Sequence, residues 1–335
     1  MWRIEIRRSA WNDYIEAQTM QDHANQPAIR SVAVVGAGRM GGPMALNLLR
    51  AGFTVTAYDT SPAQLDALAR QGLAAASSAQ EAARRAEVVI TMLPSDDALQ
   101  QAIEGPGGLL EVLRPGQVLI DMSTSKLATS QRLAELLAGR GAAMLDAPVS
   151  GGERGAREGT LSIMVGGERA AFERCRPLLA VVGTTITYIG GSGMGLVAKY
   201  VNQMIMEAAF CTIAESFALA ARAGADIEAV YQAVRGGLGG SPVLDQMLPQ
   251  LLGADLGSGR ELTLHHKDGA YALAAAEVLD AWAPITELTH ALFDQALAAG
   301  QGVHSAAAVA RVYERRLGVR LVQDEEEPRT ENREP

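Results

Sequence analysis

A lysine followed by two amide side chains stands near the start of a long apolar stretch. Lys199, Asn202 and Gln203 are spaced i, i+3 and i+4, so a helix would place them on one face. An ammonium group among apolar residues can exchange a proton with a carbonyl or hydroxyl oxygen. An isolated lysine of this kind is more often a surface residue whose methylene groups cover apolar neighbours. The two amides, and a nucleotide-binding signature upstream, favour the catalytic interpretation.

That upstream signature is a glycine-rich loop between a strand and a helix. An apolar run over 32–35 leads into it, a helix pattern over 43–51 follows, and a second strand pattern over 54–58 ends at Asp59. In a dinucleotide fingerprint the glycines permit a tight turn, close approach of the pyrophosphate and packing of the helix on the strand. A purely structural glycine turn is the alternative. We expect the cofactor contacts at Gly36, Ala37, Gly38, Arg39, Met40 and Gly41.

Asp59 favours NAD as the cofactor. Its carboxylate can accept hydrogen bonds from the ribose hydroxyls and would repel a 2′-phosphate. Thr60 follows, so no cation stands next to it for that phosphate. Arg39 or Arg70 could still reach a phosphate, so NADP is not excluded.

Strand and helix patterns then alternate, as in a doubly wound α/β sheet. Ligands of such sheets bind at the carboxyl ends of the strands, which places Leu93, Pro94 and Thr124 near the nicotinamide half of the cofactor. Capping of the following helix is a second role open to Thr124 and its neighbour Ser123. The expected strands cover 86–93, 117–121, 143–146, 161–165 and 187–189, and the expected helices 61–70, 95–103, 126–139 and 169–179.

A hydroxyl and two glycines follow the strand at 143–146. Ser150, Gly151 and Gly152 offer one O–H and successive backbone N–H groups without side chains in the way. Such a segment can form a small concave anion site, and a substrate carboxylate is the natural ligand. An ordinary turn is the alternative.

The organisation is therefore a Rossmann-type doubly wound sheet plus an all-helical C-terminal domain, joined by a long interdomain helix. We expect a disordered extension over 1–28, with Met20 as an alternative start, an NAD-binding domain over 29–192 and a helical domain over 193–318. The helix joining the two covers 193–223, and a charged disordered tail covers 319–335. Helix surfaces rich in alanine and leucine predict a homodimer or homotetramer.

Composition and charge exclude several classes of binding partner. The net charge is −9 and no basic cluster stands outside the first thirty residues, which argues against nucleic acid and anionic membranes. Lys199, Glu207 and Glu215 interrupt the longest apolar stretch, so we expect no membrane span. Cys175 and Cys211 fit neither a disulfide framework nor a metal site, which favours the cytoplasm.

Besides the cysteines, the adjacent His265 and His266 are candidate metal ligands. Adjacent residues point to different helix faces and no third ligand is suitably spaced for zinc, so we expect no metal site.

Four ordered blocks resemble one protein family: VGAGRMGGPMALNLLRAGF, DAPVSGG with GTLSIMVGG, GLVAKYVNQ, and LTLHHKD. Over residues 31–318 the chain resembles the β-hydroxyacid dehydrogenases, the group that includes 3-hydroxyisobutyrate dehydrogenases and tartronate semialdehyde (2-hydroxy-3-oxopropionate) reductases. The segment VYQAVRGGLGGSPVLD and the triplet His304-Ser305-Ala306 are most similar to the latter group. This resemblance implies an enzyme with NAD as its hydride carrier and a small carboxylate as its substrate.

The resemblance also implies roles for individual residues. Lys199 is then the catalytic acid and base, Asn202 supports the reacting oxygen, and Gln203 is a further substrate contact. Lys267 lies near both the nicotinamide and the substrate. The segment Ser150, Gly151 and Gly152 binds the substrate carboxylate, and the cofactor is lined by Gly36, Gly38, Met40, Gly41, Asp59, Leu93, Pro94 and Thr124.

The expected reaction is NAD-dependent reduction of 2-hydroxy-3-oxopropionate to glycerate, or oxidation of a similar short β-hydroxy acid. Oxidation of 3-hydroxyisobutyrate is the nearest alternative, and a catalytically silent NAD-binding module is an alternative of another class. Imine reduction and sugar-phosphate oxidation fit less well, since Lys199 is retained and no extra phosphate-binding cluster is visible. Two positions depart from the family pattern: Arg260 stands where an aromatic residue is usual, and Val303 where an acid is usual.

Overall fold

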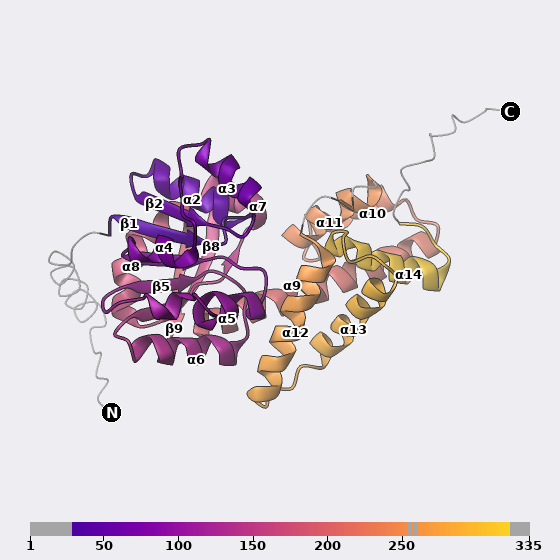
Figure 1. Ribbon diagram of the computed structural model, residues 1–335. Coiled ribbons are helices and arrows are strands. Elements are labelled where there is room, and N and C mark those ends of the chain that lie inside the picture. The colour runs from indigo at the N-terminus through magenta and orange to yellow at the C-terminus, as the bar shows by residue number, and fades with distance from the viewer. Residues whose placement is uncertain (1–28, 254–255, 258–259, 322–335) are drawn as a thin grey trace, which may run out of the picture. The chain divides into compact units, whose positions relative to one another are not determined.

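The computed structural model describes residues 29–253, 256–257 and 260–321, and its described part divides into two compact units (Figure 1). The first unit consists of the chain up to Ser123 together with 131–195. The second consists of 124–130 together with the chain from Leu196 onward. The predicted extension over 1–28 and most of the predicted tail over 319–335 lie outside the described residues.

The first unit is built on a nine-stranded sheet, which confirms the predicted α/β class. The strand order is β3-β2-β1-β4-β5-β6-β8-β7, with β9 beside β8, and the run from β3 to β6 is parallel throughout. The strands are β1 Ser31–Val35, β2 Thr54–Tyr58, β3 Ala74–Ala75, β4 Val88–Thr91, β5 Val118–Asp121, β6 Ala143–Asp146, β7 Val149–Ser150, β8 Leu161–Gly167 and β9 Gly183–Gly190.

Apolar residues on both faces of each central strand explain this sheet. Val32 and Val34 of β1 pack into one core, while Ala33 and Val35 pack into the other. A parallel strand covered by helices on both faces has this continuous apolar pattern. The covering helices are α2 Gly41–Arg50, α3 Pro62–Ala69, α4 Ala79–Arg84, α5 Asp96–Glu104, α6 Leu127–Ala138, α7 Gly152–Glu158 and α8 Arg169–Val182, with a short 3₁₀ turn η1 at Leu109–Glu111.

Serine side chains set where three of these helices begin. The hydroxyls of Ser61, Ser78 and Ser95 each accept a hydrogen bond from the backbone N–H three residues later. Each bond satisfies an amide that has no partner inside its helix. The predicted helix starts at 61 and 95 are therefore right to within a residue.

The segment after β6 differs from the prediction. The sequence predicted an anion site here, with an ordinary turn as the alternative, and no regular element. In the structure β7 pairs with β8 in antiparallel fashion and α7 follows it. The helix makes a contact that a local pattern does not show: Nδ2 of Asn47 donates to the backbone oxygen of Ala156, 2.9 Å away. The sheet is accordingly mixed rather than purely parallel, since β6 also pairs with β8 in antiparallel fashion.

The second unit consists of helices in its described residues. Its core gathers aromatic and small residues of α9, among them Phe210, Ala214 and Phe217, against α11 and α14. These helices confirm the predicted all-helical composition, although a 3₁₀ turn interrupts the helical chain at Ala306–Val309. The elements are α9 Met194–Arg222, α10 Ile227–Arg235, α11 Pro242–Leu252, α12 Leu262–Val278, α13 Pro284–Ala298, η2 Ala306–Val309 and α14 Ala310–Leu317.

Helix α9 is the longest element, with 29 residues against the 31 predicted for 193–223. By length and composition alone it could also cross a membrane, a property that it shares with long core helices of globular proteins. Here Lys199, Gln203 and Glu207 are buried along it at four-residue steps. Polar and ionisable side chains are costly in the hydrocarbon region of a bilayer, so we interpret α9 as a core helix of the second unit.

Candidate active site

The loop between β1 and α2 has the shape of a dinucleotide cradle. Gly36 has φ +89°, and a Cβ there would collide with the backbone oxygen of Met92. A Cβ on Gly41 would collide with the backbone oxygen of Gly36, so this glycine lets the helix pack against the loop. By contrast, a Cβ on Gly38 would meet nothing within 4 Å. The fold itself does not require a glycine at 38, whereas close approach of a pyrophosphate would.

The start of α2 supports the same assignment. Met40, its N-cap residue, makes no side-chain capping hydrogen bond. Backbone N–H groups at such a helix start bind phosphate, because they lack partners in the helix and the helix dipole favours negative charge. Ala37 is fixed nearby, as Nε2 of Gln64 donates to its backbone oxygen at 2.9 Å. The residues present therefore fit the pyrophosphate of NAD or NADP.

Asp59 and Arg39, the two predicted charged contacts of the cofactor, lie in different surroundings. Asp59 directly follows β2 and is half-buried, and its Oδ1 accepts the backbone N–H of Ser61 at 2.9 Å. Arg39 is exposed and its guanidinium forms an ion pair with Glu153 of α7. The ion pair holds Arg39 beside the segment that follows Gly152.

The ends of β4 and β5 are tied together by hydrogen bonds. The backbone N–H of Leu93 donates to Oγ of Ser123 at 2.9 Å, and Oγ1 of Thr91 donates to Oδ1 of Asp121 at 2.9 Å. Asp121 also accepts the backbone N–H of Ser123, 3.1 Å away. Ser123 thus braces the loop that carries Leu93 and Pro94, and the next helix begins only at Leu127.

Ser150, Gly151 and Gly152 span the end of β7 and the start of α7. Gly151 has φ +129° and Gly152 has φ +60°, conformations that other residues rarely adopt. Both glycines are exposed and Ser150 is half-buried. A Cβ on Gly151 would also approach Cδ2 of Leu161 to 3.2 Å. That these three residues bind a carboxylate stays a prediction. The backbone conformation at the two glycines is compatible with it.

In the second unit, Lys199 is buried on α9. Burial lowers the pKa of Lys199 to about 8, with Arg260 as the next largest cause and Lys267 acting in the same direction. Asp268 opposes the shift. Lys267 could be named from the sequence as a neighbour of the site, whereas the contribution of Arg260 could not. An ammonium group with such a pKa can both give and take a proton near neutral pH.

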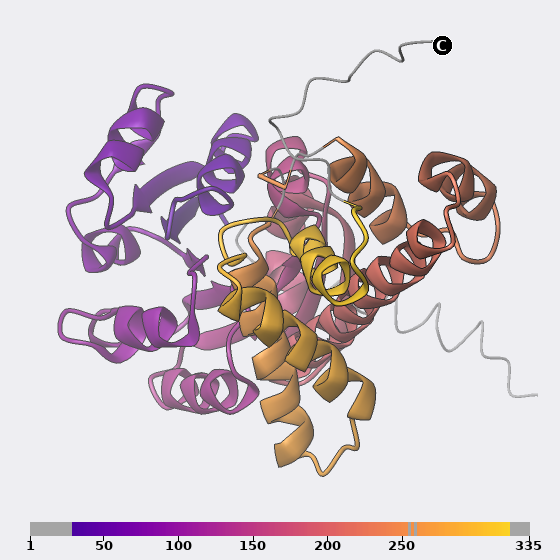
Figure 2. The ribbon, with the colours of Figure 1, turned by 90° about the vertical axis from the view of Figure 1, so that its right-hand side faces the viewer.

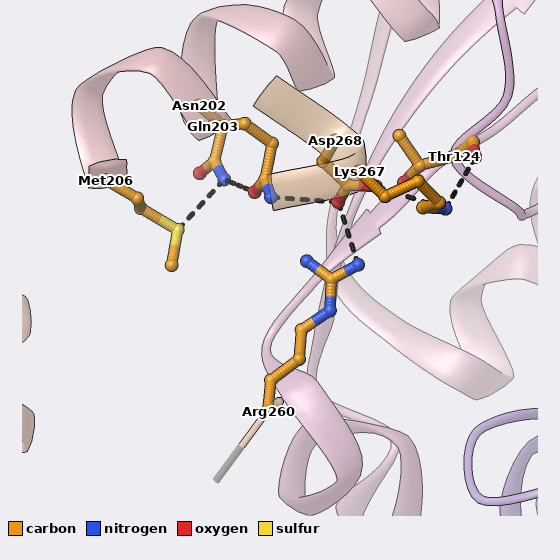
Figure 3. Close-up of polar contacts among 7 residues, drawn as sticks. All are labelled: Thr124, Asn202, Gln203, Met206, Arg260, Lys267 and Asp268. Atoms are coloured by element: carbon orange, nitrogen blue, oxygen red, sulfur yellow. Dashed lines mark hydrogen bonds and ion pairs between the residues drawn. The ribbon is translucent and has the colours of Figure 1, made fainter. Parts of the chain in front are cut away.

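Asp268 of α12, which acts on the pKa of Lys199, is the centre of a polar network (Figure 3). Its Oδ2 accepts Nε2 of Gln203 at 2.9 Å and pairs with Nη2 of Arg260 at 2.8 Å. Its Oδ1 pairs with Nζ of Lys267 at 3.2 Å. Asp268 is fully buried, and the cations Arg260, Lys267 and Lys199 outweigh that burial and hold its pKa below the usual range.

The predicted residues Asn202, Gln203, Lys267 and Thr124 meet around this centre (Figure 3). Nδ2 of Asn202 donates to Oε1 of Gln203 at 2.9 Å, so the two amides form a chain that ends on Asp268. Nζ of Lys267 donates to the backbone oxygen of Thr124 at 3.1 Å. Gln203 is buried and oriented by Asp268, whereas Asn202 is half-buried.

The sequence analysis missed the role of two acids. Asp268 follows Lys267 directly in the LTLHHKD block, and this adjacency was the available signal. Glu207 continues the four-residue spacing of Lys199 and Gln203 on α9, a pattern that was equally visible. Burial, followed by Asp268, raises the pKa of Glu207 to about 8, so this carboxyl is mostly protonated at pH 7.

Each unit holds one part of the predicted set. The first carries Gly36 to Gly41, Asp59, Leu93, Pro94 and Ser150 to Gly152, and the second carries Thr124, Lys199, Asn202, Gln203 and Lys267. The first part fits a dinucleotide. The second supplies a buried ammonium group, able to transfer protons, among oriented amides and charges.

Comparisons with known proteins decide the family. Residues 31–190 match the NAD-binding domain of 6-phosphogluconate dehydrogenase, and residues 193–313 match the NAD-binding domain of NADP-dependent 3-hydroxyisobutyrate dehydrogenase. The chain belongs to the 3-hydroxyisobutyrate dehydrogenase-like β-hydroxyacid dehydrogenases. It is therefore an NAD(P)-dependent oxidoreductase with a Rossmann-type nucleotide-binding domain.

Several members of the β-hydroxyacid dehydrogenase family are similar to the chain at comparable levels. The 2-(hydroxymethyl)glutarate dehydrogenase of Eubacterium barkeri is 33% identical over 86% of this chain and 96% of that protein. The 2-hydroxy-3-oxopropionate reductase of Escherichia coli is 36% identical over 79% and 91%, respectively. The 3-hydroxyisobutyrate dehydrogenase of Pseudomonas aeruginosa is 38% identical over 78% and 90%. As a β-hydroxyacid dehydrogenase, the protein acts on a small hydroxy acid with NAD or NADP.

Proposed function

We propose that the protein reduces 2-hydroxy-3-oxopropionate to glycerate with NADH, and oxidises glycerate in reverse. The observation that carries the choice of substrate is the polar network around Lys199. Asn202 and Gln203 follow Lys199 within about one turn of α9, and Arg260 and Asp268 lie close enough to shift its pKa. These hydrogen-bonding groups suit a substrate that carries a second hydroxyl. The similarity to the Escherichia coli reductase is in keeping with this choice.

In this mechanism the protein positions the acid and moves one proton. Bound NADH supplies the hydride, and NAD⁺ takes it up in the reverse direction. Negative charge builds on the carbonyl oxygen, and the ammonium group of Lys199 stabilises it and donates a proton to it. Asn202 supports that oxygen, Ser150 with Gly151 and Gly152 holds the carboxylate, and Lys267 and Gln203 complete the substrate contacts.

A panel of substrates tests this function. Purified protein is assayed with 2-hydroxy-3-oxopropionate, glycerate, 3-hydroxyisobutyrate, 2-(hydroxymethyl)glutarate and L-serine, with both NAD(H) and NADP(H). We expect the highest kcat/KM for 2-hydroxy-3-oxopropionate with NADH. A higher kcat/KM for any other acid in the panel would contradict the proposal, and Lys199→Ala serves as the inactive reference.

Oxidation of 3-hydroxyisobutyrate is the second candidate. The similarity to the Pseudomonas aeruginosa enzyme favours it. The methyl group of this acid calls for apolar surroundings, whereas the network at Asp268 is charged and buried. A silent NAD-binding module is a third candidate, and any turnover that is lost in Lys199→Ala excludes it.

We also propose that the protein acts in the cytoplasm as a homodimer or homotetramer. Val201, Ile205 and Leu219 of α9 are 53%, 65% and 69% exposed, which is unusual for large apolar side chains of one helix. Light scattering coupled to size-exclusion chromatography measures the assembly directly, and a mass equal to one chain would contradict the expected oligomer.

A further inference from the structure

The helix pair α12 and α13 brings together three side chains that no part of the proposed reaction uses. The two helices lie side by side and the chain turns between them over 279–283 (Figures 1 and 2). His290 and Asp294 are four residues apart on α13 and so share one face. His266 of α12 lies opposite them, and one nitrogen or oxygen from each of the three side chains falls within 4.8 Å of the others.

The contacts among the three side chains are close. Nε2 of His266 lies 2.7 Å from Oδ1 of Asp294. The rings of His266 and His290 stack with their centroids 4.2 Å apart. Nδ1 of His290 is buried and has no hydrogen-bond partner in the part of the chain that the structure describes. A buried nitrogen without a partner is costly in free energy unless something else binds it.

The cluster is separate from the proposed catalytic groups, although His266 directly precedes Lys267. The helix turns each of three consecutive side chains in its own direction. His265 packs edge-on against Phe210 in the core, Lys267 binds the backbone oxygen of Thr124, and His266 contacts α13. A ligand of His266 would therefore face α13 rather than Lys199.

We propose that His266, His290 and Asp294 bind a divalent transition-metal ion, with zinc as the best match. Two imidazoles and one carboxylate, with water in the fourth position, form a common zinc ligand set. Zinc bonds of about 2.0–2.1 Å in a tetrahedron place ligand atoms roughly 3.3 Å apart. The two stacked imidazole rings must therefore turn out of their parallel arrangement to bring both nitrogens onto one ion. Asp294 is 60% exposed, which gives the ion a route from solvent.

The choice of ion follows from the ligands. Magnesium and calcium prefer sites made of oxygen atoms, whereas imidazole favours zinc, copper and nickel. Spacing around His265 and His266 reveals no third ligand, because His290 and Asp294 belong to the next helix. A bound ion would join α12 to α13 and thereby restrain the helix that carries Lys267 and Asp268.

Zinc titration of the tag-free full chain tests this site. After treatment with EDTA and removal of the chelator, binding of ZnCl₂ is measured by calorimetry, and the shift in Tm is recorded. We expect one ion per chain and a higher Tm, no such effect with MgCl₂, and visible d–d bands of a four-coordinate ion when CoCl₂ replaces ZnCl₂. None of these measurements depends on turnover, so their outcome is independent of the proposed reaction.

Two variants assign the site to its residues. Asp294→Asn and His290→Ala should each weaken zinc binding at least about tenfold, because loss of a ligand costs more than loss of a residue that orients one. His304→Ala removes an imidazole outside the cluster and should bind zinc as the parent chain does. The Tm of each metal-free variant shows whether it is folded. Absence of zinc binding by the parent chain, or unchanged binding by both ligand variants, would overturn the proposal.

Discussion

The carboxyl group of Glu207 on α9 lies directly against the backbone of Gly269 on α12. A Cβ at 269 would collide with both carboxyl oxygens, so a glycine here allows the two helices to approach each other. We expect Gly269→Ala to destabilise the protein by about 1–3 kcal/mol, the usual cost of overpacking a core. Urea unfolding measures this. Gly236→Ala is the matched control, because a Cβ there meets nothing within 4 Å, and equal effects of the two substitutions would contradict the steric interpretation.

Glu207 also makes stability depend on pH. Its pKa is about 8 in the folded chain against an ordinary value of 4.5 for a glutamate, so the unfolded chain loses this proton first as pH rises. The contribution of Glu207 to the free energy of unfolding is therefore largest below pH 4.5 and is lost progressively as pH rises toward 8. Glu207→Gln keeps the neutral shape and removes the titration. The Tm of Glu207→Gln relative to the parent chain should rise between pH 5 and pH 8, and a constant difference would show that Glu207 is ionised in the fold.

The lowered pKa of Lys199 predicts opposite pH profiles for the two directions of the reaction. Reduction needs the ammonium form, so kcat/KM should fall above pH about 8. Oxidation needs the neutral amine, so kcat/KM should rise up to pH about 8 and then level off. Lys199→Met should lower kcat by about 10²–10⁴-fold, the usual contribution of general acid–base catalysis. Retained NADH binding, measured by fluorescence, distinguishes this loss from misfolding.

Asp59 sets the expected preference for NAD. Asp59→Ser removes the acceptor for the ribose hydroxyls and the charge that repels a 2′-phosphate. We expect kcat/KM with NADH to fall about 10–100-fold, in line with the 1.5–3 kcal/mol of a hydrogen bond to a charged group, and kcat/KM with NADPH to rise. Steady-state kinetics with both cofactors measures the change. An unchanged ratio of the two values would indicate that Asp59 does not contact the ribose.

Arg260 is expected to favour acids that carry a second polar or charged group. Its guanidinium is held by Asp268 at 2.8 Å and keeps further N–H donors for a substrate. Arg260→Ala should lower kcat/KM for 2-hydroxy-3-oxopropionate and 2-(hydroxymethyl)glutarate more than for 3-hydroxyisobutyrate. An equal decrease for all acids would assign Arg260 to the support of Asp268 instead.

Patterns within one element were enough to predict much of this fold. The alternating strands and helices, the glycine-rich loop after β1, the length of α9 and the burial of Lys199 all follow from spacing and residue type over short segments. The serine caps are local as well, because each joins residues three positions apart. Rules based on propensity and period work where the decisive contacts lie within such a segment.

The features that were missed depend on pairs of distant residues. Helix α7 is held by Asn47, which lies 109 residues away from Ala156. Asp268 gains its role from Gln203, 65 residues away, and from the cations around it. The side chains of His266, His290 and Asp294 come together only because the chain reverses between α12 and α13. No local pattern encodes which helix faces meet, so these contacts required the structure.

The buried groups Lys199, Gln203 and Glu207 all belong to one continuous helix, at intervals of about one turn. They are fixed to the same rigid rod, so a tilt or slide of α9 carries all three together and none can be repositioned by itself. A change of substrate preference during evolution is therefore easier at Arg260 than on α9, because Arg260 precedes α12 on non-helical backbone. Related chains that keep the three buried groups of α9 can in this way differ at the start of α12.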